Sequence, residues 1–447
     1  MEWTNPLIFF VDPILRAPTL GSMLMCLAAG LVGTLVFLRK QSLLGEALSH
    51  ASYPGVILGV MVMGTFFKQE AEEFWLPLFI LVGASLTALL GLGAIRFLER
   101  RLRVHSDAAL CFVLSSFFGI GLTLASEVQF SHTNLYKQVQ VYFYGQAATM
   151  TNIHILIYGI LAFVTIMMVM AFYKELQVMT FDHTFAKSIG ISTYWIDVLL
   201  FILVVLAIII GIRSVGVILM SAMLIAPAVA ARQFTNRLST MFILSAFFGV
   251  MSGFLGNYLS VELSRLFSQD LAMNRIALPT GPMIVLVAAT ITIGALFFAP
   301  ERGVFVRFLR IVRFRDRCLS ENILKAIWRH DPHRPIHLND LSPYQSISKL
   351  YLRWLLRRLV VNGWLKKIDY KTYQLTEDGR HRAMKIIRFH RLWEVYLVDY
   401  LGVGAERVHR NAEEMEHIIT PELEEELMLL LRDPKVDPHH QPIPPKE

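Results

Sequence analysis

The sequence predicts a chain in two parts of different fold class. The first is an all-α polytopic membrane region with eight or nine transmembrane helices. The second is soluble and combines a winged helix-turn-helix with a further helical domain. The chain is 55% hydrophobic with a mean hydropathy of +0.51, too apolar for a soluble globule. Its charges are uneven: residues 1–300 hold 16 Lys+Arg and 14 Asp+Glu, and the last 147 residues hold 26 and 21.

These patterns predict four segments. We expect a transmembrane domain over 1–300, a basic linker over 301–317, a winged helix over 318–380 and a second helical domain over 381–447. The three cysteines form no CxxC pair, so that neither a disulfide framework nor a thiolate zinc site is indicated.

Nine apolar stretches approach the 20 or so residues that a helix needs to cross a bilayer. With the N-terminus outside, the basic clusters at 39–40, 96–103, 232–237 and 302–317 all fall on the cytoplasmic side, as the positive-inside rule requires. The soluble part then lies in the cytosol. The stretch 215–231 is short enough to be a half-span, hence eight or nine. The stretches are 19–38, 46–67, 74–95, 107–126, 153–173, 195–212, 215–231, 240–260 and 283–299.

Glu46 and His50 are the first candidate functional pair. They lie four residues apart and therefore on one face of a helix. A carboxylate with an imidazole is a suitable ligand pair for Mn, Fe or Zn, and polar groups inside a span are often functional. From the spacing alone, the alternative is a Glu–His pair near the membrane surface with no metal role.

Five segments of this part resemble the integral permeases of bacterial ABC importers for manganese, zinc or iron. They are Gly45-Glu46-Ala47-Leu48-Ser49-His50 with Pro54-Gly55, Asp107-Ala108-Ala109-Leu110, Thr180-Phe181-Asp182 with Ala186 and Gly190, the stretch from Val215-Gly216-Val217 to Ala230-Ala231, and Leu278-Pro279-Thr280-Gly281. The resemblance implies that Glu46 and His50 act in metal passage. It also implies that Phe181, Asp182, Ala186 and Gly190 belong to the segment that couples to an ATPase.

The chain contains no Gly-Lys dipeptide and so no Walker A phosphate loop. We therefore expect a transport subunit and not an enzyme, with ATP hydrolysis on a separate ATPase subunit. The resemblance further implies an extracytoplasmic metal-binding protein, a second permease subunit or a homodimer, and a bacterial inner membrane location. A membrane metalloenzyme is disfavoured because no HExxH motif occurs.

The linker 301–317 alternates Arg with Val, Phe, Leu and Ile. Such a basic amphipathic stretch is typical of segments that lie on membrane lipid at the inner surface. Contact with DNA is the alternative.

The segment 301–391 carries 21 basic and 8 acidic groups. We expect helices at 320–330, 337–342 and 346–362, a turn at Asn362-Gly363 and a hairpin over 364–375, which together describe a winged helix-turn-helix. The alternative is a winged helix that makes protein contacts only. The candidate DNA-binding residues on the third helix and the wing are Ser348, Lys349, Tyr351, Arg353, Arg357, Arg358, Lys366 and Lys367.

The segment 392–447 is acidic, with 5 basic and 13 acidic groups. His390 and Glu394 lie one turn apart on one expected helix. His409, Glu413, Glu416 and His417 share one face of a second. Nitrogen and oxygen ligands of this kind suit Mn or Fe, although such a stripe is also typical of a solvated face.

Residues 320–445 resemble the metal-dependent repressors of the diphtheria-toxin-repressor family. The likeness rests on Leu375-Thr376-Glu377-Asp378-Gly379-Arg380, on His390-Arg391-Leu392-Trp393-Glu394 and on the closing Asp437-Pro438-His439 with Pro442-Ile443-Pro444. It implies a dimerising metal-binding domain, with a first metal site at His390, Glu394 and His409. Glu413, Glu416 and His417 match the second-site ligands. Glu413 favours Mn²⁺; Fe²⁺ is also expected, and Zn²⁺ is compatible.

The first helix of this part departs from the family pattern. Where relatives supply one or two ligands, this chain places Asn322 and Lys325, and a lysine repels a metal ion. Glu321 completes the second site instead if the register is shifted by one residue.

Taken together, the sequence predicts the permease of an ATP-driven importer for Mn, Fe or Zn, fused to a metal-responsive repressor that binds DNA. Three modes of action stay open for the soluble part: release by proteolysis near 301–320, DNA binding while tethered, or gating of the permease in response to imported metal.

Overall fold

The computed structural model of the chain describes residues 5–66, 72–131, 133–270, 277–341 and 348–446. Its internal contacts divide the chain into two compact units, Met1–Arg307 and Phe308–Glu447, here called the membrane unit and the C-terminal unit. The division falls inside the segment 301–317 that the sequence assigns to a linker.

Nine helices in the described part of the membrane unit are long and apolar enough to cross a bilayer, and each coincides with one of the nine stretches predicted above. They are α2 (Pro13–Leu38), α3 (Ser42–Phe66), α4 (Glu72–Arg100), α5 (Ser106–Ser131), α7 (Asn152–Ala171), α10 (Thr193–Val215), α11 (Val217–Phe234), α12 (Leu238–Asp270) and α13 (Thr280–Phe298). Shorter helices are α1 (Ile8–Val11), α6 (Thr133–Tyr144), η2 (Ala147–Thr149), α8 (Tyr173–Phe181) and α9 (His183–Ser188).

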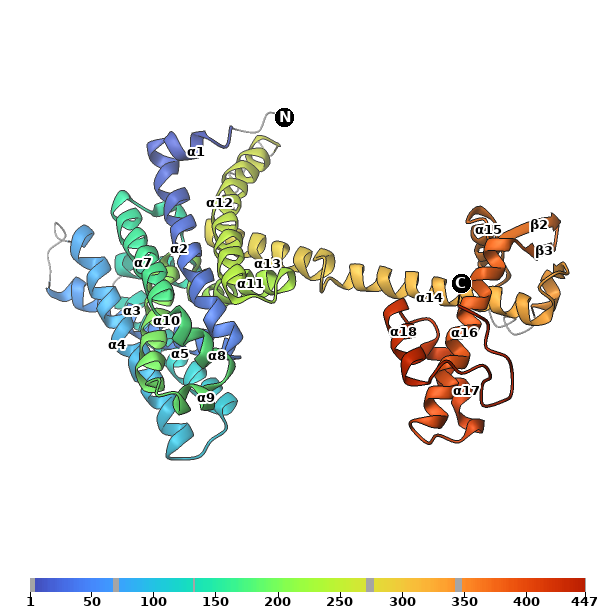
Figure 1. Cartoon of the computed structure of the whole chain (residues 1–447). Helices are drawn as coiled ribbons and strands as arrows, with labels where there is room; N and C mark the ends of the chain where they lie inside the picture. The colour runs from blue at the N-terminus through green and yellow to red at the C-terminus, as the bar shows by residue number, and fades with distance from the viewer. Residues whose placement is uncertain (1–4, 67–71, 132, 271–276, 342–347, 447) are drawn as a thin grey trace. The chain divides into compact units, whose positions relative to one another are not determined.

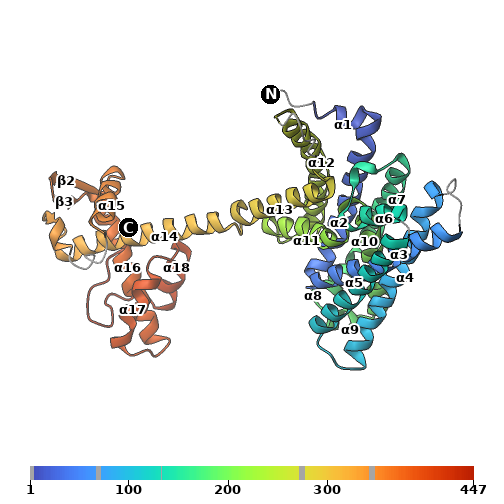
Figure 2. The same ribbon diagram turned by 180° about the vertical axis from the view of Figure 1, so that it is seen from behind.

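Helix α2 is the central element of the membrane unit. It packs against α12, α11, α7 and α10, and it lies between α12 and α7 in both views (Figure 1 and Figure 2). A second group forms around α3, which contacts α4 and α5 as well as α10 and α11. The largest apolar cluster runs through both groups.

Close approach between α3 and α4 depends on glycine. A Cβ on Gly55 would lie 2.1 Å from the carbonyl oxygen of Gly83, and one on Gly83 would lie 2.3 Å from that of Gly55. No side chain fits such a gap, and small residues of this kind allow transmembrane backbones to pack by van der Waals contact. Helix α3, which carries Glu46 and His50, is therefore in direct backbone contact with α4 at Gly55.

The short stretch 215–231 is a helix of its own. Helix α11 has 18 residues, or about 27 Å at 1.5 Å per residue. It is separated from α10 by Gly216, whose φ of +95° is one that residues with a side chain rarely adopt. The described residues thus contain nine helices that are long and apolar enough to cross a bilayer, with α11 among them.

The C-terminal unit joins a small sheet to a set of helices. Its elements are α14 (Val304–His330), whose first four residues fall in the membrane unit, β1 (Ile336–His337), η3 (Leu338–Asp340), α15 (Lys349–Val361), β2 (Leu365–Asp369), β3 (Thr372–Leu375), α16 (Glu377–Asp399), α17 (Ala405–Met415) and α18 (Pro421–Leu430). The sheet has the order β1-β3-β2, with both pairs antiparallel. Together with α14 and α15 it forms the expected winged helix, over the core of Leu324, Leu355 and Leu359.

Two local expectations differ from the structure. The linker stretch and the helix expected at 320–330 form one continuous helix, α14, because neither Pro nor Gly interrupts the chain between Gly303 and Pro332. The helix expected at 337–342 is wrong over its described residues. Ile336–His337 pairs with Thr372–Tyr373 as strand β1, and a single 3₁₀ turn follows. Residue 342 and the start of the helix expected at 346–362 lie outside the described residues.

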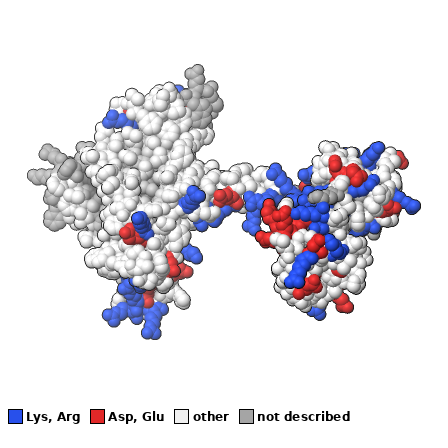
Figure 3. Space-filling model, in the orientation of Figure 1, with Lys and Arg blue, Asp and Glu red and all other residues white. Residues whose placement is uncertain are grey.

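Helix α16 connects the two parts of the C-terminal unit. It begins beside β3, at Thr376, whose hydroxyl caps it by accepting from the N–H of Gly379, and it packs further along against α17 and α18. The border expected at 380/381 therefore falls inside one helix. Figure 3 shows the difference in surface between the units: charged side chains are sparse on the visible body of the membrane unit and dense on the C-terminal unit.

Candidate metal centres and interaction surfaces

The first candidate site lies on α3 in the membrane unit. Glu46 is half-buried and His50 is 8% exposed, one turn further along the same face. The imidazole meets the ring of Phe118 on α5 edge-on, with centroids 4.6 Å apart. Within the part of the chain that the structure describes, His50 Nδ1 is buried without a hydrogen-bond partner and Glu46 makes no ion pair. Such a buried, unpartnered nitrogen typically costs about 1–3 kcal/mol.

Aromatic rings surround this pair. Tyr53 is 2% exposed, and its ring lies 5.9 Å from that of Phe118 and 5.5 Å from that of Phe143. Pro54 follows on the same helix and has no N–H to donate to the carbonyl of His50. An imidazole nitrogen, a carboxylate and a backbone oxygen therefore lie within one helical turn beside apolar rings, where exclusion of water strengthens attraction for a cation.

The second candidate site is the turn from α8 to α9. Asp182 caps α9: its Oδ1 accepts from the N–H groups of Thr184 and Phe185, both at 2.9 Å. These hydrogen bonds lower the pKa of Asp182 below its ordinary value. Ala186 is fully buried, and Gly190 ends the helix at φ +83° with a Schellman pair of hydrogen bonds, from its own N–H and from the next one.

An apolar surface is exposed on this turn. Phe181 is 64% exposed, and Phe185 and Ile189 are each more than half exposed. Arg39, at the end of α2, fixes the turn on its buried side. Its Nη1 donates to Asp197 Oδ1 of α10 at 2.6 Å, and its Nη2 lies 3.8 Å from Met179 Sδ of α8. A fixed turn with exposed aromatic side chains is suited to docking in a groove of another protein.

The third candidate site is the group of His390, Glu394 and His409, here called the first ligand group. His390 and Glu394 lie on α16 and are both 2% exposed; His409 on α17 has a half-exposed side chain. Their ligand atoms all lie within 4.8 Å of one another, and over the described residues no other group of three does so. Glu394 Oε1 is 3.0 Å from His409 Nδ1 and 3.2 Å from His390 Nε2.

Among the described residues, the hydrogen-bond partners of the acid in this group are the two imidazoles. Burial raises the pKa of Glu394, but hydrogen bonds from His390 and His409 outweigh it and hold this pKa at about 2. Burial lowers the pKa of His390, yet its bonds to Glu394 and Glu416 leave this pKa raised overall. An acid held ionised between two imidazoles, with no ion pair to Lys or Arg among the residues that the structure describes, fits a divalent cation with borderline N/O preference. A bound ion would supply the positive charge that otherwise comes from protons.

Glu416 and His417 form a different group with two residues of α14. The four residues, here called the ion-pair group, are Glu321, Lys325, Glu416 and His417. Glu416 Oε1 accepts from Lys325 Nζ at 2.5 Å, and its Oε2 lies 2.6 Å from His390 Nδ1. His417 Nδ1 lies 2.8 Å from Glu321 Oε2. All four residues are at least nine-tenths buried. Here each acid is paired with a cation of the protein.

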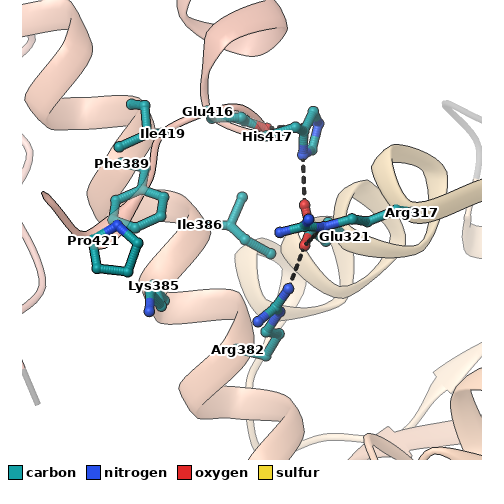
Figure 4. A pocket seen from close by; sticks show the side chains of 10 residues that line it. All are labelled: Arg317, Glu321, Arg382, Lys385, Ile386, Phe389, Glu416, His417, Ile419 and Pro421. Atoms are coloured by element: carbon teal, nitrogen blue, oxygen red, sulfur yellow. Dashed lines mark hydrogen bonds and ion pairs between the residues drawn. The ribbon is translucent and has the colours of Figure 1, made fainter. Parts of the chain in front are cut away.

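Glu321 is the most heavily bonded acid of the ion-pair group. Arg382 Nη2 donates to its Oε1 at 2.6 Å and Arg317 Nε at 3.1 Å. Burial raises the pKa of Glu321, but the bonds to His417, Arg382 and Arg317 lower it to about 2. Figure 4 shows Glu321 between these partners at the edge of a pocket, which is also lined by Ile386 and Phe389 of α16.

The expected stripe on α17 is divided by the end of the helix. Helix α17 ends at Met415, so that Glu416 is its C-cap and His417 follows in the turn. Glu413 instead lies with the first ligand group: its Oε1 is 3.6 Å from His409 Nε2, and its side chain is half-exposed. Over the described residues, Glu413, Glu416 and His417 therefore do not form one three-ligand group.

The fourth candidate site is the basic face of α15 and the wing. Lys349, Arg353 and Arg357 recur every four residues and are exposed, and no ion pair is made by any of them within the described residues. Ser348 caps α15 by accepting from the N–H of Tyr351. On the wing strand β2, Lys366 and Lys367 are both exposed.

Two of the predicted DNA-binding residues are held by Asp316 of α14. Tyr351 donates its hydroxyl to Asp316 Oδ1, and Arg358 Nη1 lies 3.6 Å from Asp316 Oδ2. Arg358 also covers the ring of Trp354, 5.5 Å from its centroid. Sequence reasoning missed this contact and the roles of Asp316 and Arg382. The spacing of Arg317 and Glu321 by four residues was the one local signal available.

Comparison with known proteins gives two family matches. Residues 11–299 match the ABC 3 transport family, and residues 376–445 match the iron dependent repressor, metal binding and dimerisation domain. A relative named "Probable metal transport system membrane protein", from Chlamydia pneumoniae, is 39% identical over 445 residues, which cover 98% of each chain. The manganese transport system membrane protein MntC of Bacillus subtilis is 33% identical over 384 residues, or 85% of this chain and 82% of that one.

A solved structure agrees with the fold of the first part. The structure of PsaBC from Streptococcus pneumoniae, in complex with Fab, aligns with a TM-score of 0.56 at 26% identity. The alignment covers 68% of this chain and 98% of that one. These likenesses confirm the two resemblances drawn from the sequence motifs.

Proposed function

Because the chain belongs to the ABC 3 transport family and is a multi-pass membrane protein, we propose that it is the permease subunit of an ATP-driven importer of a divalent transition metal. The fused repressor-type domain is proposed to sense the same class of metal in the cytosol. Manganese is favoured, since the Bacillus subtilis relative is named for it and the first ligand group offers nitrogen and oxygen ligands without thiolate.

The observation that carries the proposal is the presence, in one chain, of a ligand pair inside a span and a preformed ligand group outside the spans. Glu46 and His50 lie on a buried helix face with His50 Nδ1 unpartnered, which suits brief contact with a passing ion. His390, Glu394 and His409 already converge within 4.8 Å, which suits retention. Polar groups within a span are costly, and those that occur there are therefore often functional.

One partner is proposed from an exposed surface and two others from membership of the family. The exposed Phe181 and Phe185 beside Asp182 and Gly190 are proposed to dock on a separate ATPase subunit. An extracytoplasmic binding protein delivers metal to the opposite face, and a second permease subunit, identical or not, completes the pathway. In this arrangement the inner membrane holds nine spans, with the C-terminal unit in the cytosol.

Metal uptake tests the permease role. In a bacterial strain that lacks its own manganese permease, the chain is expressed with its cognate ATPase and binding protein, and uptake of radioactive Mn²⁺ is measured. The double variant Glu46→Ala, His50→Ala is expected to lose uptake while still inserting in the membrane. The matched control is Glu99→Ala, His105→Ala, which removes an acid and a histidine outside the motif and should transport normally. Undiminished uptake by the first variant contradicts the role in passage.

For the C-terminal unit we propose DNA binding while it remains joined to the permease. Its free cations Lys349, Arg353 and Arg357 lie in a row on α15, where a recognition helix meets phosphates and base edges. Release by proteolysis near 301–320 is less favoured, because this segment lies in the continuous helix α14 from Val304 onward and cleavage is usually at exposed loops. Appearance of a free C-terminal fragment in immunoblots of Mn²⁺-replete cells would favour release instead.

Gating of the permease is the second candidate function, since the C-terminal unit follows directly from the last span. The variant Arg353→Ala distinguishes DNA binding from gating of the permease. If the unit binds DNA, this variant loses repression in a reporter strain and keeps normal Mn²⁺ uptake. If it gates transport, removal of residues 331–447 alters the dependence of uptake on internal Mn²⁺, whereas Arg353→Ala has no effect on either readout.

A further inference from the structure

The ion-pair group contains a buried lysine where acids and an imidazole would otherwise attract a cation. Lys325 on α14 is 4% exposed, and its Nζ lies 2.5 Å from Glu416 Oε1. Glu416 is 1% exposed. An ionised acid this far from water requires a partner charge, and the ammonium of Lys325 provides it.

The neighbouring acid is satisfied in the same way. Glu321 accepts from Arg382 and Arg317 and pairs with His417. By contrast, the described part of the chain places only the imidazoles of His390 and His409 at hydrogen-bond distance from Glu394 of the first ligand group. The two groups thus contain similar acids and imidazoles but differ in whether a protein cation is already in place.

Lys325 is also linked to the first ligand group. Glu416 uses one oxygen for Lys325 and the other for His390 Nδ1, at 2.6 Å. This leaves His390 Nε2 directed at Glu394 and His409. A carboxylate on the far nitrogen fixes the tautomer and orientation of a ligating histidine. Glu416 is therefore placed to orient a ligand, and Lys325 to hold Glu416.

We infer that Lys325 is a resident cation that stands in place of a second metal ion, so that the C-terminal unit binds one divalent ion and not two. The inference rests on the proposed metal site at the first ligand group and adds the reason why the second group needs no metal. The positive charge that holds α14, α16 and α17 together at Glu416 is then supplied by the protein itself. Only the first ligand group responds to metal supply.

The test counts metal ions on the full-length chain in detergent micelles. Equilibrium dialysis against Mn²⁺ alone, followed by atomic spectroscopy, gives the ions bound per chain. Lys325→Glu exchanges the cation for a ligand beside Glu416 and His417, and it is expected to bind one more Mn²⁺ than the wild type. Lys385→Glu is the matched control, since Lys385 lines the same pocket and makes no ion pair within the described residues; it should bind the wild-type number. Lys325→Arg keeps a cation and should also bind that number.

Two results overturn the inference: no gain in Lys325→Glu, or a wild-type chain from which Glu416→Ala removes one ion and Glu394→Ala removes another. Failure of the proposed sensor site is recognised separately, as a Glu394→Ala variant that loses no ion.

If Lys325→Glu does not fold, the unfolding temperatures of two other variants, measured in the presence of a chelator, test the inference instead. Lys325→Met is expected to lower the unfolding temperature on the order of 10 °C, because it strands a buried charge, and Lys385→Met should not. Equal temperatures for these two variants also overturn the inference.

Discussion

The candidate metal ligands of the two units differ in how far their acids are already paired within the protein. In the membrane unit, His50 keeps a buried nitrogen without a partner and Glu46 has no ion pair among the described residues. In the C-terminal unit, Glu321 and Glu416 are paired through both carboxylate oxygens, Glu394 Oε1 lies between two imidazoles, and His390 contacts two acids. In the described part of the chain, His417 Nε2 is buried there without a hydrogen-bond partner, so the difference between the units concerns their acids. A ligand that must release its ion quickly gains from incomplete coordination, whereas a sensor gains from a site that is already assembled.

Removal of one acid should reveal the largest difference between the units. Glu321→Ala leaves Arg382, Arg317 and His417 without their common partner, and loss of one member of a buried ion pair typically costs about 3–5 kcal/mol. His50→Ala removes no hydrogen bond of Nδ1 and should therefore destabilise the protein less than Glu321→Ala does. Thermal unfolding followed by tryptophan fluorescence measures both. A small effect of Glu321→Ala places this acid in contact with water and contradicts the comparison.

Low pH should destabilise the C-terminal unit, over a range set by the pKa values of Glu321 and Glu394. The pKa values of Glu321 and Glu394 are held at about 2 in the folded state, below the ordinary value near 4.5. Their stabilisation is therefore complete above pH 4.5 and is lost as the pH falls toward 2, by roughly 3 kcal/mol for each acid at most. Unfolding temperatures measured between pH 5.5 and 2.5 test this sign, with Glu321→Gln as the variant that should lose part of the dependence. A temperature that rises on acidification contradicts it.

Loss of an acid should affect the equilibrium Mn²⁺ affinity about a hundredfold more in the C-terminal unit than in the membrane unit. Glu394→Ala removes the one acid of the first ligand group and is expected to weaken Mn²⁺ binding to the full chain by 100-fold or more, equal to about 2.7 kcal/mol. Glu46→Ala should leave this affinity unchanged, because passage ligands contribute to rate and not to retention. Isothermal titration in detergent gives both constants. Equal losses from the two variants remove the distinction between a passage site and a sensor site.

The smallest expected difference lies within the basic face. Arg353→Ala removes a free cation and should weaken DNA binding by about tenfold, or ~1.4 kcal/mol, and lower the salt dependence by about one ion. Arg358→Ala should weaken DNA binding less and destabilise the unit more, because Arg358 is paired with Asp316 and stacked on Trp354. Gel-shift titrations at several salt concentrations measure the first effect and thermal unfolding the second. A larger binding loss for Arg358→Ala indicates that the ion pair opens on DNA.

Much of the fold was predictable because it depends on local patterns. All nine spans were found from apolar length, since the bilayer imposes one dimension on every such helix. The wing hairpin was found from alternation and from Asn362-Gly363, where Gly363 has φ +77°. The helix expected at 337–342 failed over its described residues because β1 forms only by pairing with β3, 35 residues later in the chain.

The sequence by itself determined which residues carry the chemistry, and the tertiary structure decided which of them act together. Helical spacing placed His390 beside Glu394 and Glu46 one turn from His50, because neighbours on a helix are fixed by its pitch. It did not show that Glu416 meets Lys325, 91 residues away, or that His417 meets Glu321, 96 residues away. Those contacts depend on how α14, α16 and the end of α17 pack. In a buried setting the partner of each acid, whether lysine or imidazole, decides whether a metal ion is still required.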